Sequence, residues 1–144
     1  MKKIAALMIA LLMIFASCSP ADSDGVIEIT ERFFVNQTME VISNPDQYMG
    51  RTIRLEGMFW NITCVVTGEQ LYFVVRNTDG CCGPIEPIGF ELRIDGFDPP
   101  PHDAWVEVEG ILERYTGIWN QNILRLEVVA LTAMSERGAE FVTQ

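Results

Sequence analysis

Residues 104–131 read AWVEVEGILERYTGIWNQNILRLEVVAL, and this stretch decides the fold class. In its first run, 104–113, apolar side chains alternate with glutamates, and in its second run, 122–131, they alternate with Arg125 and Glu127. Strict alternation of this kind is typical of a β-strand that buries one face. The stretch therefore predicts two half-buried strands joined by a turn.

Upstream of this stretch, three more runs have the composition of strands, and turn residues separate them. These runs are 52–60, 70–76 and 88–94. The run 70–76 is almost wholly apolar, which is typical of a central strand, whereas the other two alternate. A proline-rich turn, 98–103, follows the last of them.

A single helix is predicted before the strands, over residues 31–43. Thr30 can cap its start, and Asn44-Pro45 forces its end, because the residue before a proline disfavours the helical conformation. The apolar side chains expected along one side of the helix are Phe34, Met39, Val41 and Ile42.

These elements predict a mainly β protein with one domain, residues 26–144. One helix and five short strands suit a small five-stranded OB-like barrel preceded by one short α-helix. A β-sandwich is the alternative, because the number of strands does not separate the two architectures.

The chain begins with the features of an export signal. Lys2 and Lys3 precede an apolar run, Ile4–Ala16, that is too short to span a bilayer as a helix. The sequence Phe15-Ala16-Ser17-Cys18 resembles the lipobox of bacterial lipoproteins, in which the cysteine receives the lipid. An ordinary secretory signal is the alternative.

The lipobox predicts three segments at this end of the chain: a signal peptide, 1–17, a short tether, 18–25, and then the domain. Cys18 is the expected lipidation site, with palmitate among the acyl chains. We therefore expect the protein on the extracytoplasmic face of the bacterial cell membrane, held there by its lipid anchor.

The net charge of the chain limits the kinds of molecule that we expect it to bind. The net charge is −10, and removal of the two lysines in the signal peptide takes it to −12. Such a chain repels phosphate backbones, so we expect no nucleic acid partner.

Cys64, Cys81 and Cys82 remain in the exported domain, and three interpretations stay open: a structural disulfide, a soft metal or thiol-reactive site, or buried packing. A Cys81–Cys82 bond needs a strained ring. A bond from Cys64 is disfavoured, because Cys64 and Cys81 follow two successive strands and would lie at opposite ends of an antiparallel hairpin.

A metal site at the vicinal cysteines would use the Cys81 and Cys82 thiolates, which favour zinc or cuprous copper. Glu86 and Asp79 are candidate oxygen ligands, and the single histidine, His102, is a candidate nitrogen ligand. These residues do not form a repeated C-x-x-C pattern, so the sequence indicates a metal site less specifically than such a pattern would.

Arg76 comes at the end of a predicted strand, shortly before Cys81 and Cys82. Its charge would steady the loop between the strands or lower the pKa of a thiol. A surface arginine paired with an acid is the alternative.

The aromatic side chains offer a second candidate surface, since OB-folds bind ligands on exposed rings. Trp105 is expected in the core or at its rim, and Trp60 and Trp119 are expected to be more exposed, with Tyr72 and Tyr115 nearby. No serine, histidine and acid arrangement and no phosphate-binding glycine loop is found. An enzyme is therefore disfavoured.

Three stretches, 27–59, 71–93 and 104–112, carry further motifs: N-P-x-x-Y-x-G-[KR] at 44–51, a strand that ends in arginine just before two adjacent cysteines, and W-V-x-V-x-G at 105–110. Together they resemble the soluble C-terminal domain of the YcgQ-like family, a group of bacterial membrane proteins. The resemblance covers roughly residues 27–131 and implies an OB-like fold and a neighbouring permease as partner. The matching positions are Glu31, Phe34, Asn44, Pro45, Tyr48, Gly50, Arg51, Ile53, Gly57, Arg76, Cys81, Cys82, Pro87, Gly89 and Trp105–Gly110.

The chain departs from this family in two ways. The membrane-spanning half is absent, and a lipid anchor is expected to replace it. The usual A-D-A after the two cysteines is Gly83-Pro84-Ile85-Glu86 here, so Glu86 is the candidate to replace the aspartate.

The leading hypothesis is a lipid-anchored binding module with a metal-binding cysteine loop, accessory to a membrane transport system. A thiol-redox protein and a purely structural assembly factor are the alternatives.

Overall fold

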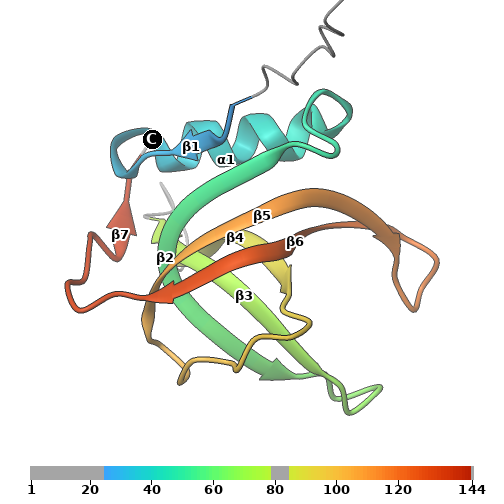
Figure 1. Cartoon of the computed structure of the whole chain (residues 1–144). Coiled ribbons are helices and arrows are strands. Elements are labelled where there is room, and N and C mark those ends of the chain that lie inside the picture. The colour runs from blue at the N-terminus through green and yellow to red at the C-terminus, as the bar shows by residue number, and fades with distance from the viewer. Residues whose placement is uncertain (1–24, 79–84, 144) are drawn as a thin grey trace, which may run out of the picture.

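The computed structural model describes residues 25–78 and 85–143, and five long strands form a closed barrel in it (Figure 1). These strands are β2 (Thr52–Thr63), β3 (Gln70–Thr78), β4 (Glu86–Arg93), β5 (Trp105–Thr116) and β6 (Asn122–Ala133). They pair in the order β2-β5-β6-β4-β3, and β3 pairs with β2 to close the ring. Only the β4–β6 pairing within the barrel is parallel. This arrangement confirms the mainly β, OB-like barrel, and the β-sandwich alternative is wrong.

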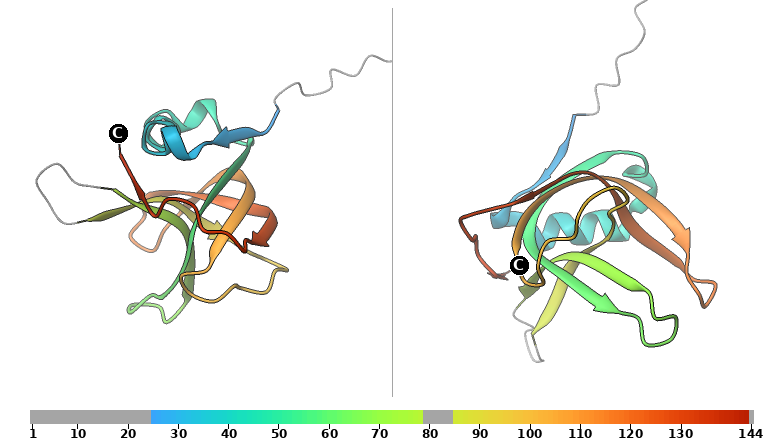
Figure 2. Two further views of the ribbon diagram at one scale, coloured as in Figure 1. Left: turned by 90° about the vertical axis from the view of Figure 1, so that its left-hand side faces the viewer. Right: turned by 60° about the horizontal axis from the view of Figure 1, so that its bottom comes forward.

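A short N-terminal layer covers one end of the barrel (Figures 1 and 2). It contains β1 (Ile27–Ile29), which pairs in parallel with β2, a 3-10 turn η1 (Glu31–Phe33), helix α1 (Phe34–Ser43) and a second 3-10 turn η2 (Pro45–Gln47). The helix predicted before the barrel is therefore confirmed, and its first three residues adopt the tighter 3-10 geometry.

Two details of the helix prediction are wrong. Met39 and Ile42 are exposed, and the buried side of α1 consists of Phe34, Val35, Thr38 and Val41. This spacing forms one stripe of the helix, and Met39 and Ile42 lie beyond its edge. Thr30 stands at the N-cap position, but its side chain makes no capping hydrogen bond, because its hydroxyl instead donates to Oε1 of Gln37 at 3.2 Å.

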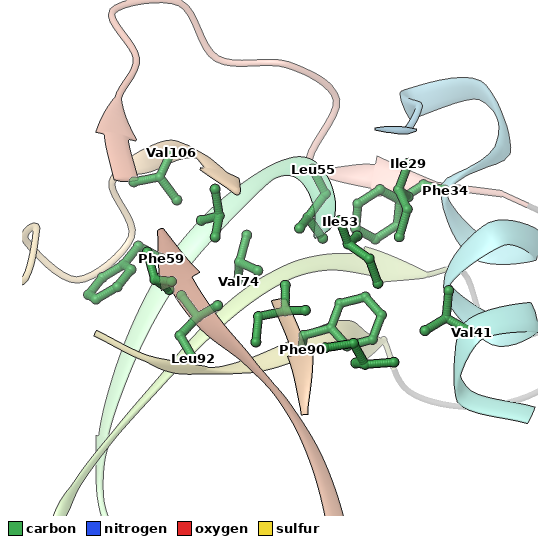
Figure 3. Close-up of a cluster of buried hydrophobic side chains, with 14 of the residues drawn as sticks. Ile29, Phe34, Val41, Ile53, Leu55, Phe59, Val74, Phe90, Leu92 and Val106 are labelled. Carbon is green, nitrogen blue, oxygen red and sulfur yellow. The ribbon is translucent and has the colours of Figure 1, made fainter. Parts of the chain in front are cut away.

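The core fills the barrel and continues to the inner side of α1 (Figure 3). The alternation predicted for β2, β4, β5 and β6 is confirmed, because most of the residues predicted to face inward are the buried ones. No alternation was predicted for β3, and its buried residues, Val74, Val75 and Arg76, are consecutive. Fully buried examples are Ile53 in β2, Val74 in β3, Val106 and Val108 in β5, and Leu126 in β6. Figure 3 shows Phe34 and Val41 of α1 pointing toward the same cluster as Ile53 and Phe90.

Gly89 allows β3 and β4 to cross closely in the wall of the barrel. A Cβ atom at this position would lie 1.9 Å from the carbonyl oxygen of Val74, far inside van der Waals contact. Gly57 in β2 has a similar role, since a Cβ there would lie 2.7 Å from the oxygen of Val75. Both positions therefore require glycine for curvature.

A strand that the sequence did not indicate, β7 (Phe141–Val142), pairs in parallel with the last residues of β3. The segment before it crosses the outer side of the barrel, where Gly138 lies against the Trp105 ring. Only two residues long, β7 has no alternation from which to predict it. Its buried residue, Val142, joins the main core.

None of the helices in residues 25–78 and 85–143 has the length and apolar content that a bilayer span requires. The predicted signal peptide, 1–17, and the lipidation site Cys18 lie outside the described residues.

Candidate functional site

The described part of the chain ends on both sides of the two vicinal cysteines. Asp79, Cys81 and Cys82 lie outside the described residues, within the segment 79–84, which we call the cysteine loop. The residues on either side of it are described, and they form what we call the neck: the end of β3, the start of β4 and β7.

The neck holds both ends of the cysteine loop at a fixed spacing. Thr78 pairs with Glu86 across the β3–β4 ladder, and the Thr78 hydroxyl donates to the Glu86 carbonyl oxygen at 3.0 Å. On the other side of β3, the Asn77 amide donates to the carbonyl oxygen of Glu140 at 2.8 Å. β3 is thus paired on both edges up to its last residue.

Arg76 is the central residue of the neck, and its side chain is only 2% exposed. Its Nε donates to the carbonyl oxygen of Glu56 at 2.8 Å, where the β2–β3 ladder has ended. Its Nη1 donates to Glu31 Oε2 and to the Ala139 carbonyl oxygen, both at 3.0 Å. Arg76 is therefore not a surface residue, although it is paired with an acid, Glu31, as that alternative expected.

Aromatic rings complete the environment of the Arg76 guanidinium. Its Cζ lies 5.0 Å from the centre of the Phe34 ring and 4.8 Å from that of Trp105. A guanidinium over a ring is attracted by the electrons of the ring face. Arg76 therefore ties β3 to β2, to the N-terminal layer and to the C-terminal segment.

Glu31 is the acidic partner in this arrangement. Its Oε2 accepts the backbone amide of Ala139 at 2.9 Å in addition to Arg76. The amide of Ala139, and then Arg76, hold the pKa of the Glu31 carboxyl below its usual value. The two hydrogen bonds favour the charged form, which makes the Glu31 side chain an acceptor for both chain segments.

Glu86, the candidate oxygen ligand, begins β4 and is exposed. Thr78 fixes the backbone of Glu86, so the Glu86 side chain projects from a defined backbone position beside the cysteine loop. Within residues 25–78 and 85–143, no group of three or more histidine, cysteine or acidic side chains is arranged to hold a metal ion. A metal site at the neck would therefore need the thiols of Cys81 and Cys82.

His102 does not lie at the neck. Its Nδ1 is 3.2 Å from the backbone nitrogen of Asn61, and its ring stacks on Trp60. Asn61 is paired with Tyr72, six residues along β3 from Thr78, which corresponds to roughly 20 Å of strand. The structure thus separates His102 from Glu86, the other candidate ligand among the described residues.

Cys64 lies at the far end of the β2–β3 hairpin from Thr78, as the argument against a Cys64 disulfide assumed. Hydrogen bonds from the Thr67 hydroxyl, and then from the amides of Thr67 and Val66, lower the pKa of the Cys64 thiol. Cys64 therefore lies in the turn of the β2–β3 hairpin.

The aromatic side chains do not form one platform. Trp105 is buried, as expected, and its indole nitrogen donates to Glu56 Oε2 at 3.2 Å. Tyr72 stacks on Phe59 inside the barrel, and Trp60 is half-buried. Trp119 is exposed, as predicted.

Sequence reasoning missed the partners of Arg76. Glu31 matched a position of the YcgQ-like resemblance, but no role was predicted for it. No helix or strand was predicted for residues 137–142. Nothing in the local sequence indicates that a backbone carbonyl at Ala139 meets a side chain 63 residues away.

Comparison with known proteins identifies a family for this chain. The family model of the DUF1980 C-terminal domain matches residues 16–143. Among solved structures, the N-terminal domain of PriB protein from Thermoanaerobacter tencongensis matches at 15% identity and a TM-score of 0.35. The match covers 59% of this chain and 97% of that one. No curated protein sequence matches the chain.

Proposed function

Because the chain belongs to the DUF1980 C-terminal domain family and folds as an OB-like barrel, we propose that it is a binding module and not an enzyme. In this proposal Cys18 anchors it by lipid to the extracytoplasmic face of the bacterial cell membrane. The cysteine loop binds a soft metal ion, zinc or cuprous copper, and a membrane transport protein such as a permease is the partner.

The observation that carries the metal proposal is the neck. β3 is paired on both edges up to Thr78, and β4 begins at Glu86 opposite it. Fixed strand ends lower the entropy that is lost when a loop closes around an ion. Arg76 and Glu31 support this rigidity from the inner side of the neck.

The chemistry suits a soft cation. Two thiolates, one from each adjacent cysteine, would bind zinc or cuprous copper, and the carboxylates of Glu86 and Asp79 would complete the ligands. Thiols lose their protons on binding, so affinity rises with pH. Since the Arg76 guanidinium is committed to Glu31 and to two carbonyl oxygens, its role is to hold the neck.

The anchor and the transport partner rest on other observations. Phe15-Ala16-Ser17-Cys18 supports lipidation, and the resemblance to membrane proteins encoded beside a permease supports a transport partner. The acidic chain is suited to a cationic cargo.

The test is a titration of the exported domain with zinc and with cuprous ion. We expect saturable binding that is lost when Cys81 and Cys82 are both replaced by serine. The matched control, Cys64→Ser, should bind like the parent. Equal binding by the double variant would overturn the metal proposal. So would a Cys81–Cys82 disulfide found by mass spectrometry of protein isolated without reductant, and that result would favour the redox alternative.

A further inference from the structure

Five exposed apolar side chains gather on two hairpins at the far end of the barrel from the neck. Val65 and Val66, in the β2–β3 turn, are 98% and 63% exposed, and Ile118 and Trp119, in the β5–β6 turn, are 54% and 72% exposed. Together with Ile62 near the end of β2, we call them the hairpin-tip surface. Exposed apolar residues are ordinary when single, but a group of them marks an interaction site.

The two turns are neighbours in space. Figures 1 and 2 show both hairpins projecting to the same side, away from β7. Glu69, beside the first turn, and Tyr115, beside the second, line one groove. The pKa of Tyr115 is raised to about 12, by burial, by its hydrogen bond to Glu91 and, less strongly, by the nearby charge of Glu69.

Both hairpin ends are almost free of charge in a strongly acidic chain. Residues 60–75 contain one charged side chain, Glu69, and residues 115–124 contain none, although the chain has 20 acidic residues. A turn exposed to water usually carries polar or charged residues. The tips are therefore suited to contact with an apolar surface.

The groove beside the two tips is lined by three acidic side chains, Glu69, Glu91 and Asp95, and by two arginines. It has a volume of about 670 Å³. Its arginines, Arg93 and Arg125, are already paired with Glu113. Glu69 and Glu91 take part in no ion pair among the described residues, and Glu91 accepts the Tyr115 hydroxyl at 2.7 Å. The groove can therefore accept an added cation.

We propose that the hairpin-tip surface docks a partner protein, which lays an apolar segment on the two tips and places a lysine or arginine side chain in the groove beside Glu69 and Glu91. This proposal goes beyond the proposed function, because neither tip belongs to the neck. Aromatic and aliphatic anchors beside opposite charges are typical of protein interfaces.

Charge argues against the other occupants. A bilayer rich in anionic lipid would repel a chain with a net charge of −10 and an acidic groove between its tips. A second copy in a symmetric dimer would set the same acidic surface against itself. A basic partner protein has neither disadvantage.

The experiment is site-specific photo-crosslinking in cells that produce the protein. A benzophenone amino acid replaces Val65 in one variant and Trp119 in another. Phe33, 51% exposed on the N-terminal layer, is the matched control position. We expect the same partner polypeptide in adducts from both tips and not from Phe33, and a crosslinked peptide that contains apolar residues beside a lysine or arginine.

A charge reversal tests the groove. Glu69→Lys should reduce the Trp119 adduct about tenfold, because like charges across an interface are strongly unfavourable. Glu136→Lys, an exposed position in the C-terminal segment, should not reduce it. Melting temperatures close to the parent establish that each variant is folded.

Other outcomes would overturn the proposal. Adducts with lipid would assign the tips to the bilayer, and adducts with another copy would assign them to self-association. An absence of adducts, or an adduct yield that Glu69→Lys leaves unchanged, would show that no basic partner docks at the tips.

Discussion

The two ends of the β2–β3 hairpin are built in opposite ways. At the neck, β3 is paired on both edges, and Arg76 joins β2, η1 and the C-terminal segment through buried hydrogen bonds. At the tip, Val65 and Val66 are open to water. At the neck, polar groups form hydrogen bonds within the protein, whereas at the tip apolar side chains remain exposed and available for contact.

If this comparison is right, substitutions at the neck should cost far more stability than substitutions at the tips. The largest effect is expected for Gly89→Ala, in the barrel wall next to the neck, because the new methyl group would meet the Val74 carbonyl oxygen at 1.9 Å. We expect the free energy of unfolding to fall by roughly 3 kcal/mol or more in chemical denaturation. Gly25→Ala, with nothing within 4 Å, is the control and should change it by less than about 0.5 kcal/mol.

Arg76→Met is expected to have the next largest effect. It keeps much of the volume but leaves the carbonyl oxygens of Glu56 and Ala139 without their donor, at a cost of about 2 to 3 kcal/mol. The control is Arg114→Met, since Arg114 makes an exposed pair with Asp46 and should lose about 0.5 kcal/mol or less. Equal losses in the two variants would contradict a special role of Arg76.

Glu31→Gln tests the contact between Arg76 and Glu31 by the pH dependence of stability. The folded-state pKa of Glu31 is lowered, so its stabilising effect is present above the unfolded pKa, about 4.3, and is lost as pH falls through the folded value. Because Glu31 is half exposed, we expect a loss of only about 1 kcal/mol at pH 7. Melting curves from pH 7 to pH 3 should show the difference from the parent shrinking below about pH 4. A difference that stays constant would mean that the carboxylate charge is not involved.

The smallest effects should be at the tips. Trp119→Gln and Val65→Thr remove exposed apolar groups, and each should change the free energy of unfolding by less than about 0.5 kcal/mol. Thermal melting of the two variants measures this directly. A loss above 1 kcal/mol would show that the tips belong to the folded core and would weaken their assignment as a docking surface.

The sequence predicted the barrel well because each of its strands repeats a local pattern. Alternation such as Val106 and Val108 against Glu107 and Glu109 is a property of neighbouring residues, so no knowledge of distant contacts is needed. The failures were non-local. Met39 looked like a core residue by its apolar character alone, but the orientation of α1 on the barrel leaves it exposed.

The neck was the least predictable part of the site for the same reason. Arg76 could be identified as a residue close to the vicinal cysteines, but its burial depends on Glu31 and Ala139, which are 108 residues apart. A two-residue strand such as β7 carries too little sequence to be recognised before its partner is known. The hairpin tips were partly visible, because the exposure of Trp119 was predicted correctly.

The late position of β7 in the chain also determines the order in which contacts can form during synthesis. Residues 139–142 are made last among the described residues, yet they supply the acceptor for Arg76 and the outer partner of Asn77. Ribosomal synthesis is slow compared with hairpin formation, so β2, β3 and β4 can pair while these residues are still missing. The neck therefore gains its full set of contacts only when the final segment has been made and has paired with β3.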